Sequence, residues 1–233
     1  MRTLGLLGGM SWESTLSYYR LLNERVRERI GGLHSAKLLL YSVDFAEIEV
    51  LQHRGEWDAA GEVLTEAAAR LQQAGAQALV ICTNTMHKVA AQVEAATDIP
   101  LLHIADATAH RIHAAGLHSV GLLGTRFTME QAFYRERLER SGLQVLVPGT
   151  ATRERIHAII YDDLCRGVIR EESRAFYRQA IAELVAQGAQ GIILGCTEIG
   201  LLVGTADAPV PLFDTARIHA EDAADWALED TSS

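Results

Sequence analysis

The stretch at 75–80, Gly-Ala-Gln-Ala-Leu-Val, returns at 188–193 as Gly-Ala-Gln-Gly-Ile-Ile, an offset of 113 residues (188 − 75). Two further matches occur in the same order, Gly-Leu-Leu-Gly at 5–8 with 121–124 and Pro-Leu-Leu at 100–102 with Pro-Leu-Phe at 211–213. Any parallel-sheet protein repeats an apolar strand beside a glycine, but the Ala-Gln pair after the glycine is not part of that general pattern. The three ordered matches therefore predict two similar lobes.

Short apolar runs alternate with longer amphipathic stretches along the chain. Most of the apolar runs are continuous, which is typical of strands buried on both faces of a parallel sheet. Strands are predicted at Leu4–Leu7, Lys37–Ser42, Ala78–Cys82, Leu101–Ile104, Val120–Leu123, Leu143–Val147, Gly191–Gly195 and Pro211–Phe213. Helices are predicted at Glu13–Arg29, Ala59–Gln73, Thr85–Ala96, Ala107–Ala115, Met129–Arg140, Arg153–Arg166, Glu171–Ala186 and Thr215–Leu228. This order predicts an α/β fold with parallel sheets flanked by helices.

We expect two pseudo-symmetric α/β lobes, with the end of the chain returning to the first. The first lobe is predicted at residues 1–97 with the C-terminal helix, 215–230, added to it, and the second at 98–209. In open parallel sheets, ligands bind at the carboxyl ends of the strands, beside the amino ends of the helices that follow. We therefore expect the active site in a crevice between the lobes.

Composition excludes several classes of protein. The 233 residues are 48% hydrophobic and 22% charged, which supports packed cores and excludes a disordered chain. The 21 Lys and Arg against 30 Asp and Glu give a net charge of −9, which disfavours nucleic acid as a partner. Because no apolar run reaches about 18 residues and no signal-peptide pattern begins the sequence, we expect a cytoplasmic protein without membrane contact. Three scattered cysteines fit free thiols in a reducing compartment.

The 113-residue offset also aligns the polar residues that follow two of the strands. Thr83 corresponds to Cys196, and Asn84 corresponds to Thr197. A cysteine between a strand end and a helix start lies near unpaired backbone N–H groups and the positive end of the helix dipole, conditions that lower the pKa of a thiol. Cys196 is therefore the best candidate for a reactive group, with a small buried hydrophobe as the alternative interpretation.

The other two cysteines are interpreted as structural. Cys165 lies in a helical pattern beside Leu164 and is expected to pack. Cys82 is the last residue of a predicted strand and corresponds to Gly195, so its side chain is expected to point into the sheet.

Three ordered motifs resemble the aspartate/glutamate racemase family over essentially the whole chain. They are Gly-Leu-Leu-Gly-Gly-Met-Ser-Trp-Glu-Ser-Thr at 5–15, Asn-Thr-Met-His at 84–87 and Gly-Cys-Thr-Glu at 195–198. Within the family, the chain looks most like the branch of L-aspartate/glutamate-specific or broad-specificity amino-acid racemases. The resemblance implies two α/β domains, no cofactor, and two residues on opposite faces of the substrate α-carbon that remove and return a proton. It also suggests a homodimer.

The sequence departs from the family at one of those two positions. The family generally has cysteine before Asn84, where this chain has Thr83, and Cys82 comes one residue early. A shift of one residue at a strand end turns a side chain to the other face, so Cys82 is a poor substitute. A threonine hydroxyl is too weak an acid to form a standing alkoxide near neutral pH. We therefore expect Cys196 to act as the thiolate base and Thr83 as the donor on the opposite face.

The lysine content favours chemistry without pyridoxal phosphate. Such an enzyme needs a lysine for its Schiff base, and the chain has only Lys37 and Lys88, which are interpreted as an edge residue and a solvated charge. The carbanion would then be stabilised by hydrogen bonds to the substrate carboxylate. The expected substrate-binding residues at helix starts and turns are Met10, Ser11, Asn84, Thr85 and Thr197.

Two further residues, Gln52 and Asp163, are candidates for substrate contacts, and each also has an interpretation without a role in binding. Gln52, with Arg54, could meet a distal carboxylate, or could lie in a solvated loop. Asp163 could approach the substrate ammonium group, or could lie on an exposed helix face. The family often has a lysine after the glycine that is Gly167 here, whereas this chain has Val168, so Arg166 and Arg170 are possible replacements.

Metal and nucleotide sites are weaker interpretations. His110 and His113 are three residues apart on one predicted helix, but no third ligand has a convincing spacing, so no metal is expected. The Gly-Leu-Leu-Gly-Gly run is not a dinucleotide fingerprint. His87 and His219 could hydrogen-bond near the crevice or be structural.

The sequence thus predicts a cofactor-independent racemase of acidic amino acids. One alternative is a related isomerase or decarboxylase acting on a small diacid. The other is an amino-acid-binding protein that has lost one catalytic cysteine.

Overall fold

The computed structural model describes residues 1–229 and divides the chain into two compact units. The first unit contains Met1–Ile104 and the segment from His219 onward, and the second contains Ala105–Ile218. Residue 230, the last in the helix range predicted for the first lobe, lies outside the described residues. Each unit contains one four-stranded sheet in which all neighbouring strands are parallel, which confirms the predicted α/β class.

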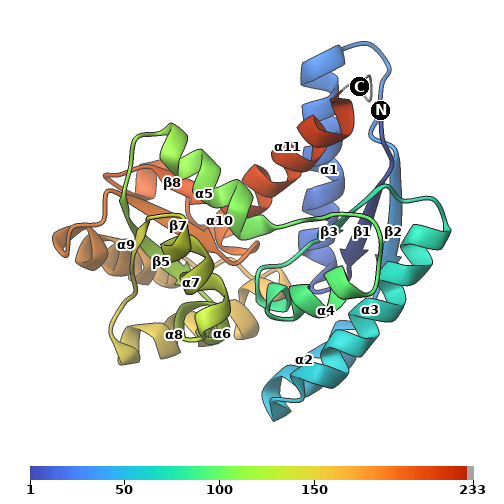
Figure 1. Cartoon of the computed structure of the whole chain (residues 1–233). Coiled ribbons are helices and arrows are strands. Elements are labelled where there is room, and N and C mark those ends of the chain that lie inside the picture. Colours follow the sequence, from blue (N-terminus) through green and yellow to red (C-terminus); the bar gives the residue numbers. More distant parts are fainter. Residues whose placement is uncertain (230–233) are drawn as a thin grey trace. The chain divides into compact units, whose positions relative to one another are not determined.

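The sheet of the first unit has the strand order β2-β1-β3-β4, and its first three strands are labelled in Figure 1. Its strands are β1 (Leu4–Gly8), β2 (Leu38–Ser42), β3 (Ala78–Ile81) and β4 (Leu101–Leu102). Its helices are α1 (Trp12–Ile30), α2 (Phe45–Arg54), α3 (Trp57–Gln73), the 3-10 helix η1 (Thr85–Val89) and α4 (Ala90–Ala95). The last helix, α11 (Thr215–Leu228), begins in the second unit and ends in the first.

One hydrophobic core packs α2, α3 and α4 against the strands of the first unit. It joins Leu7 of β1 and Ile81 of β3 to Leu64 of α3, with Ile48 and Val93 contributed by α2 and α4. Away from this core, α1 and α11 lie side by side (Figure 1), joined by the Arg25–Asp225 ion pair and by a hydrogen bond between Tyr18 and His219.

The second unit repeats this topology with the order β6-β5-β7-β8. Its strands are β5 (Ser119–Gly124), β6 (Gln144–Leu146), β7 (Gly191–Gly195) and β8 (Leu212–Asp214). Its helices are α5 (Ile104–Ala114), α6 (Arg126–Glu130), α7 (Ala132–Arg140), α8 (Thr150–Asp162), η2 (Leu164–Arg166), α9 (Glu171–Ala186), α10 (Ile199–Leu202) and η3 (Thr205–Asp207). The central strands β1 and β5, and likewise β3 and β7, hold equivalent places in the two sheets.

The Gly-Ala-Gln repeat has the same physical task before β3 and before β7. Gly75 and Gly188 have φ values of 99° and 104°, a region that favours glycine. The following glutamines both accept a backbone hydrogen bond from the segment that leads into the neighbouring strand. Gln77 Oε1 accepts from Thr3 N at 2.9 Å, and Gln190 Oε1 accepts from His118 N at 2.9 Å. The repeat is therefore a helix-ending turn whose side chain fixes the register of the next strand.

Among the differences from the predicted elements, one concerns α2 and another concerns α6 and α7. Residues 45–54, where no helix was predicted, form α2, because Asp44 caps its start by accepting a hydrogen bond from Ala46 N and Gly55 ends it in the left-handed conformation. The helix predicted at Met129–Arg140 is two helices, because Gln131 has extended dihedral angles between α6 and α7.

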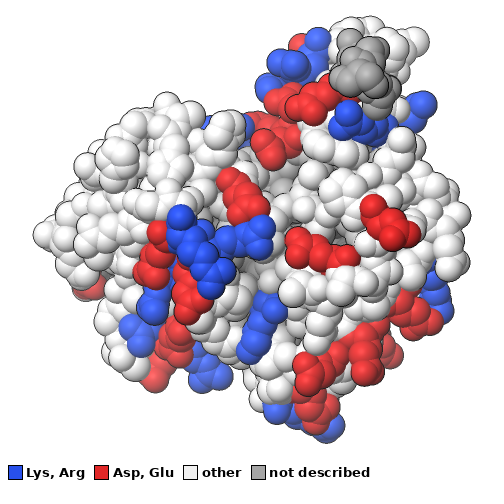
Figure 2. Space-filling model, in the orientation of Figure 1, with Lys and Arg blue, Asp and Glu red and all other residues white. Residues whose placement is uncertain are grey.

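Basic and acidic side chains are interspersed on the face shown in Figure 2. Ion pairs in the second unit, such as Arg137 with Asp106 and Arg153 with Glu130, bring opposite charges together. No helix within residues 1–229 is long and apolar enough to cross a membrane.

Candidate active site

The carboxyl end of β3 presents Thr83 and Asn84 in the first unit. Cys82 N still donates to Leu7 O of β1, at 2.9 Å, so the ladder ends one residue before Thr83. The Thr83 side chain is partly exposed, whereas Asn84 and Thr85 are buried. Cys82 is buried, and its thiol contacts Val80 O of its own strand. The Cys82 side chain is therefore buried within the first unit, as the prediction that it points into the sheet requires.

A side chain fixes the backbone carbonyl of Thr83. His87, one turn further along η1, lies with its Nδ1 atom 2.8 Å from Thr83 O. On the other side of the ring, His87 Nε2 accepts from Ile104 N at 3.2 Å. The strand end is therefore held by the histidine of the Asn-Thr-Met-His motif.

The turn after β1 lies beside this strand end. Gly9 has a φ of 94°, and a Cβ atom there would collide with the carbonyl oxygen of Val43. Ser11 caps α1, where its hydroxyl accepts from Ser14 N at 3.4 Å, and Ser14 Oγ donates to Cys82 O at 2.9 Å. The Met10 side chain belongs to the hydrophobic core, so only its backbone is available to a ligand.

The carboxyl end of β7 presents Cys196, Thr197 and Glu198 in the second unit. All three residues are buried, and Cys196 is 8% exposed. Cys196 Sγ lies 3.0 Å from Glu198 Oε2, and Thr197 Oγ1 donates to the same oxygen at 2.7 Å. The Glu198 carboxylate thus accepts hydrogen bonds from both neighbouring side chains.

The environment of Cys196 differs from the expected one. Burial raises the pKa of the Cys196 thiol well above its ordinary value, and repulsion from the Glu198 carboxylate raises it further. The expectation of a lowered pKa at this helix start is therefore wrong, because burial and the neighbouring carboxylate both disfavour the thiolate. The Cys196 thiol lies within hydrogen-bond distance of the Glu198 carboxylate, with the sulfur as the donor.

Glu198 was not among the predicted site residues, although the Cys-Thr-Glu order already placed a carboxyl two residues from the sulfur. Two other side chains, Tyr177 and Cys165, interact electrostatically with Cys196. The Tyr177 hydroxyl of α9 is fully buried without a hydrogen-bond partner within residues 1–229, and burial followed by repulsion from Cys196 raises its pKa well above the ordinary value. Cys165 in η2 is partly buried, and its charge interaction with Cys196 is among the causes of the raised Cys196 pKa.

The structure shows the surroundings of Gln52 and Asp163, while their roles as substrate contacts stay predictions. Gln52 is a buried residue of α2 that donates to Met86 Sδ at 3.1 Å, so the solvated-loop alternative is wrong. Asp163 ends α8 and accepts from Arg170 at 2.9 Å and Ser173 at 3.3 Å, so it does not lie free on an exposed helix face. The hydrogen bond from Arg170 is the main reason why the pKa of Asp163 is lowered.

The two lysines lie in different surroundings, and the same part of the structure bears on a metal site. Lys88 Nζ lies 4.0 Å from the ring centroid of Trp57, a cation–π contact, instead of being a purely solvated charge. Lys37 is exposed at the start of β2. Over the part of the chain that the structure describes, no three His, Cys, Asp or Glu side chains form a metal-binding group.

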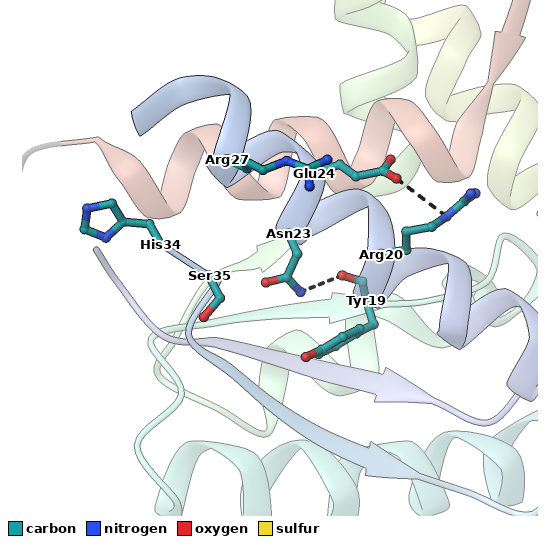
Figure 3. Close-up of a pocket in the computed structure, with 7 residues that line it drawn as sticks. All are labelled: Tyr19, Arg20, Asn23, Glu24, Arg27, His34 and Ser35. Atoms are coloured by element: carbon teal, nitrogen blue, oxygen red, sulfur yellow. Dashed lines mark hydrogen bonds and ion pairs between the residues drawn. The ribbon is translucent and has the colours of Figure 1, made fainter. Parts of the chain in front are cut away.

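A hollow of about 370 Å³ in the first unit contains none of the predicted site residues (Figure 3). It is lined by Tyr19, Arg20, Asn23, Glu24, Arg27, His34 and Ser35. Arg20 pairs with Glu24, and Asn23 donates to Tyr19 O, as the dashed lines in Figure 3 mark. This hollow lies between α1 and the segment that leads into β2, apart from the carboxyl ends of β1 and β3.

A family model and a curated protein both match nearly the whole chain. The family model described as Asp/Glu/Hydantoin racemase matches residues 7–223. Among curated proteins, the chain is 22% identical over 227 residues to the broad specificity amino-acid racemase RacX of Bacillus subtilis (strain 168), covering 94% of this chain and 95% of that protein.

Two solved structures are similar over nearly their whole lengths. One is a candidate Asp/Glu racemase from Yersinia pestis, with a TM-score of 0.92, 59% identity, and coverage of 98% of this chain and 100% of the other. The second is an aspartate racemase homologue from Pyrococcus horikoshii OT3, with a TM-score of 0.86, 34% identity and the same two coverages.

Proposed function

The chain belongs to the Asp/Glu/hydantoin racemase family, and from that premise we propose that it interconverts L- and D-aspartate or glutamate by cofactor-independent removal and return of the α-proton. The observation that carries the proposal is the buried Cys196 thiol, 3.0 Å from the Glu198 carboxylate at the end of a central strand. This arrangement supplies a thiol that can transfer a proton, together with a carboxylate that can accept the proton of that thiol.

The first step is ionisation of Cys196. Its S–H proton passes to Glu198, and Thr197 stabilises the accepting oxygen by a hydrogen bond of 2.7 Å. The thiolate then takes the α-proton of one enantiomer, which leaves a carbanion at the substrate and a thiol at Cys196. Return of a proton from the same sulfur restores the starting enantiomer, whereas a proton delivered on the opposite face inverts it.

Thr83 is proposed as the group on that opposite face. It holds the position in the first unit that corresponds to Cys196 in the second, because each residue directly follows the strand position paired with the end of β1 or β5. When the Thr83 hydroxyl donates its proton to the carbanion, the transient alkoxide takes a proton from water and Glu198 releases the proton that it received to water, which restores the starting protonation. A neutral threonine hydroxyl is only a weak base. Since two enantiomers have equal free energies in water, kcat/KM must nevertheless be equal in the two directions, and asymmetry is confined to kcat and KM separately.

The substrate carboxylate is proposed to bind polar groups that follow the strands. Ser11, Asn84, Thr85 and Thr197, with the backbone at Met10, provide hydrogen-bond groups near strand ends and helix starts. Such groups stabilise the carbanion when they point to where its charge develops. Gln52 and Asp163 are proposed as further substrate contacts, and Asp163 would then share its carboxylate between Arg170 and the substrate ammonium group.

Aspartate and glutamate are proposed as substrates on the strength of the family and of the names of the relatives. A carboxylate at the far end of the substrate would bind Arg166 or Arg170, because Val168 stands where the family often has lysine. A homodimer and a cytoplasmic location stay predictions.

A side-by-side assay tests the proposal. L- and D-aspartate, L- and D-glutamate, maleate and malonates are incubated with the protein without added cofactor, and products are separated by chiral chromatography. Interconversion of an acidic amino acid supports the racemase. Conversion of maleate or malonates alone would establish the isomerase or decarboxylase alternative, and binding of an amino acid without any conversion would establish the binding-protein alternative.

A further inference from the structure

We propose that His87 is a positioning residue for Thr83, because its imidazole fixes the peptide that carries the proposed donor hydroxyl. This inference rests on the proposed function, since it names the residue that holds one of its two proton-transfer groups. It concerns contacts within the first unit only.

The two hydrogen bonds of the ring determine its protonation. Ile104 N can only donate, so His87 Nε2 must carry a lone pair. Thr83 O can only accept, so His87 Nδ1 must carry the proton. The ring is therefore a neutral imidazole in the Nδ1–H tautomer, and both of its nitrogens are engaged by backbone groups.

A second buried histidine secures the segment to which His87 is bound. His219 Nε2 donates to Leu102 O at 2.7 Å, and its Nδ1 accepts from the Tyr18 hydroxyl at 2.9 Å. The His87 ring stacks edge-on against His103, with ring centroids 4.4 Å apart, and lies 5.7 Å from that of His219. All three histidines are buried. The backbone partner of His87 is thus itself fixed by α1 and α11.

Fixing the carbonyl of Thr83 also directs its side chain. Thr83 lies just beyond the last ladder bond of β3, so neighbouring strands do not hold its carbonyl, and the bond at 2.8 Å from His87 takes that place. Threonine is branched at Cβ and has few χ1 rotamers once its backbone is set. A displaced carbonyl therefore turns the hydroxyl away from its working direction.

Two substitutions separate the two ring nitrogens. The His87→Asn side chain can place an amide N–H near the Nδ1 position, which preserves the donor to Thr83 O. The His87→Gln side chain can place an oxygen near the Nε2 position, which preserves only the acceptor for Ile104 N. The readout is the ratio of solvent deuterium exchange at Cα to inversion, measured on the enantiomer that Cys196 deprotonates.

The positioning role predicts a specific pattern. In His87→Gln, inversion falls while exchange through Cys196 continues, so the ratio rises about 10- to 100-fold, the size expected for a reacting group displaced by about 1 Å. His87→Asn restores a ratio near that of the wild type. Tyr18→Phe loses the hydrogen bond to His219 but keeps the bond from His219 to Leu102 O and both bonds of His87. It therefore lowers the melting temperature without changing the ratio.

Other outcomes overturn the inference. An unchanged ratio in His87→Gln, or an equal rise in Tyr18→Phe, would show that His87 has only a structural role, while the wild-type activity would leave the proposed racemase intact. A wild-type protein with neither exchange nor inversion would refute both proposals. As an independent readout, 15N NMR of the imidazole must find the neutral Nδ1–H tautomer, and the opposite tautomer would contradict the geometry.

Discussion

Replacing Glu198 by glutamine is expected to make the Cys196 thiol easier to ionise and, at the same time, to slow racemisation. A thiolate 3.0 Å from the carboxylate would be repelled by about 1.4 kcal/mol at a dielectric constant of 80 and about 5.5 kcal/mol at 20. Glu198→Gln removes this repulsion and therefore lowers the pKa of the Cys196 thiol. Each ~1.4 kcal/mol of repulsion removed raises the thiolate population about tenfold below the titration midpoint. Burial remains as the first cause of the shift, so the pKa stays above that of an ordinary thiol.

The assay is alkylation by iodoacetamide as a function of pH, followed by mass spectrometry of the peptide that contains Cys196. At pH values below the midpoint of the variant's alkylation curve, the variant is expected to be alkylated about tenfold faster than the wild type, or more. Racemisation is expected to fall about 10²- to 10⁴-fold, the usual contribution of a general base. Glu183→Gln, which removes an exposed carboxylate from α9, is the matched control and should change neither quantity.

Two results would refute this reasoning. An alkylation midpoint that is unchanged or higher in Glu198→Gln would show that the carboxylate does not oppose thiolate formation. Full racemase activity in the same variant would show that Glu198 does not receive the proton of Cys196.

Two further predictions concern stability. Gly9→Ala is expected to lower the free energy of unfolding by about 2 kcal/mol or more, because its φ of 94° is strained for alanine and the new Cβ meets Val43 O. Denaturant unfolding measures this loss, with Gly204→Ala as the control because the Cβ added there meets no atom within 4 Å. Equal losses of stability in the two variants would contradict the prediction. Asp163→Asn is expected to lower the melting temperature at neutral pH. Because the pKa of Asp163 is lower in the folded than in the unfolded state, its contribution is present above the unfolded pKa and is lost as the pH falls through the folded pKa; a difference between variant and wild type that persists at the acid end would argue against the Arg170 pairing.

The strands were predictable from the sequence because they are buried on both faces and therefore read as continuous apolar runs. All eight are present, and the Gly-Ala-Gln repeat marks equivalent turns before β3 and β7. The short helix α2 was not recognised, although Asp44 and Gly55 are a typical start and end, because its charged residues hide the apolar periodicity.

The candidate site was predictable by position and not by environment. The repeat offset placed Thr83 and Cys196 at equivalent strand ends, which follows from topology alone. Whether a thiol there is ionised depends on burial and on the distance to Glu198, and both are properties of the folded chain. The bond from His87 to Thr83 O likewise depends on the η1 turn that brings a side chain back over four residues.

The most direct test of the account is deuterium incorporation at Cα in heavy water, measured by NMR on L- and D-aspartate and glutamate without added cofactor. The wild type and Cys82→Ala, which removes the buried structural thiol, are expected to exchange the α-proton at similar rates. Cys196→Ala is expected to show only the background rate. Exchange at the wild-type rate in Cys196→Ala, or none in the wild type with any of these amino acids, would contradict proton transfer by Cys196.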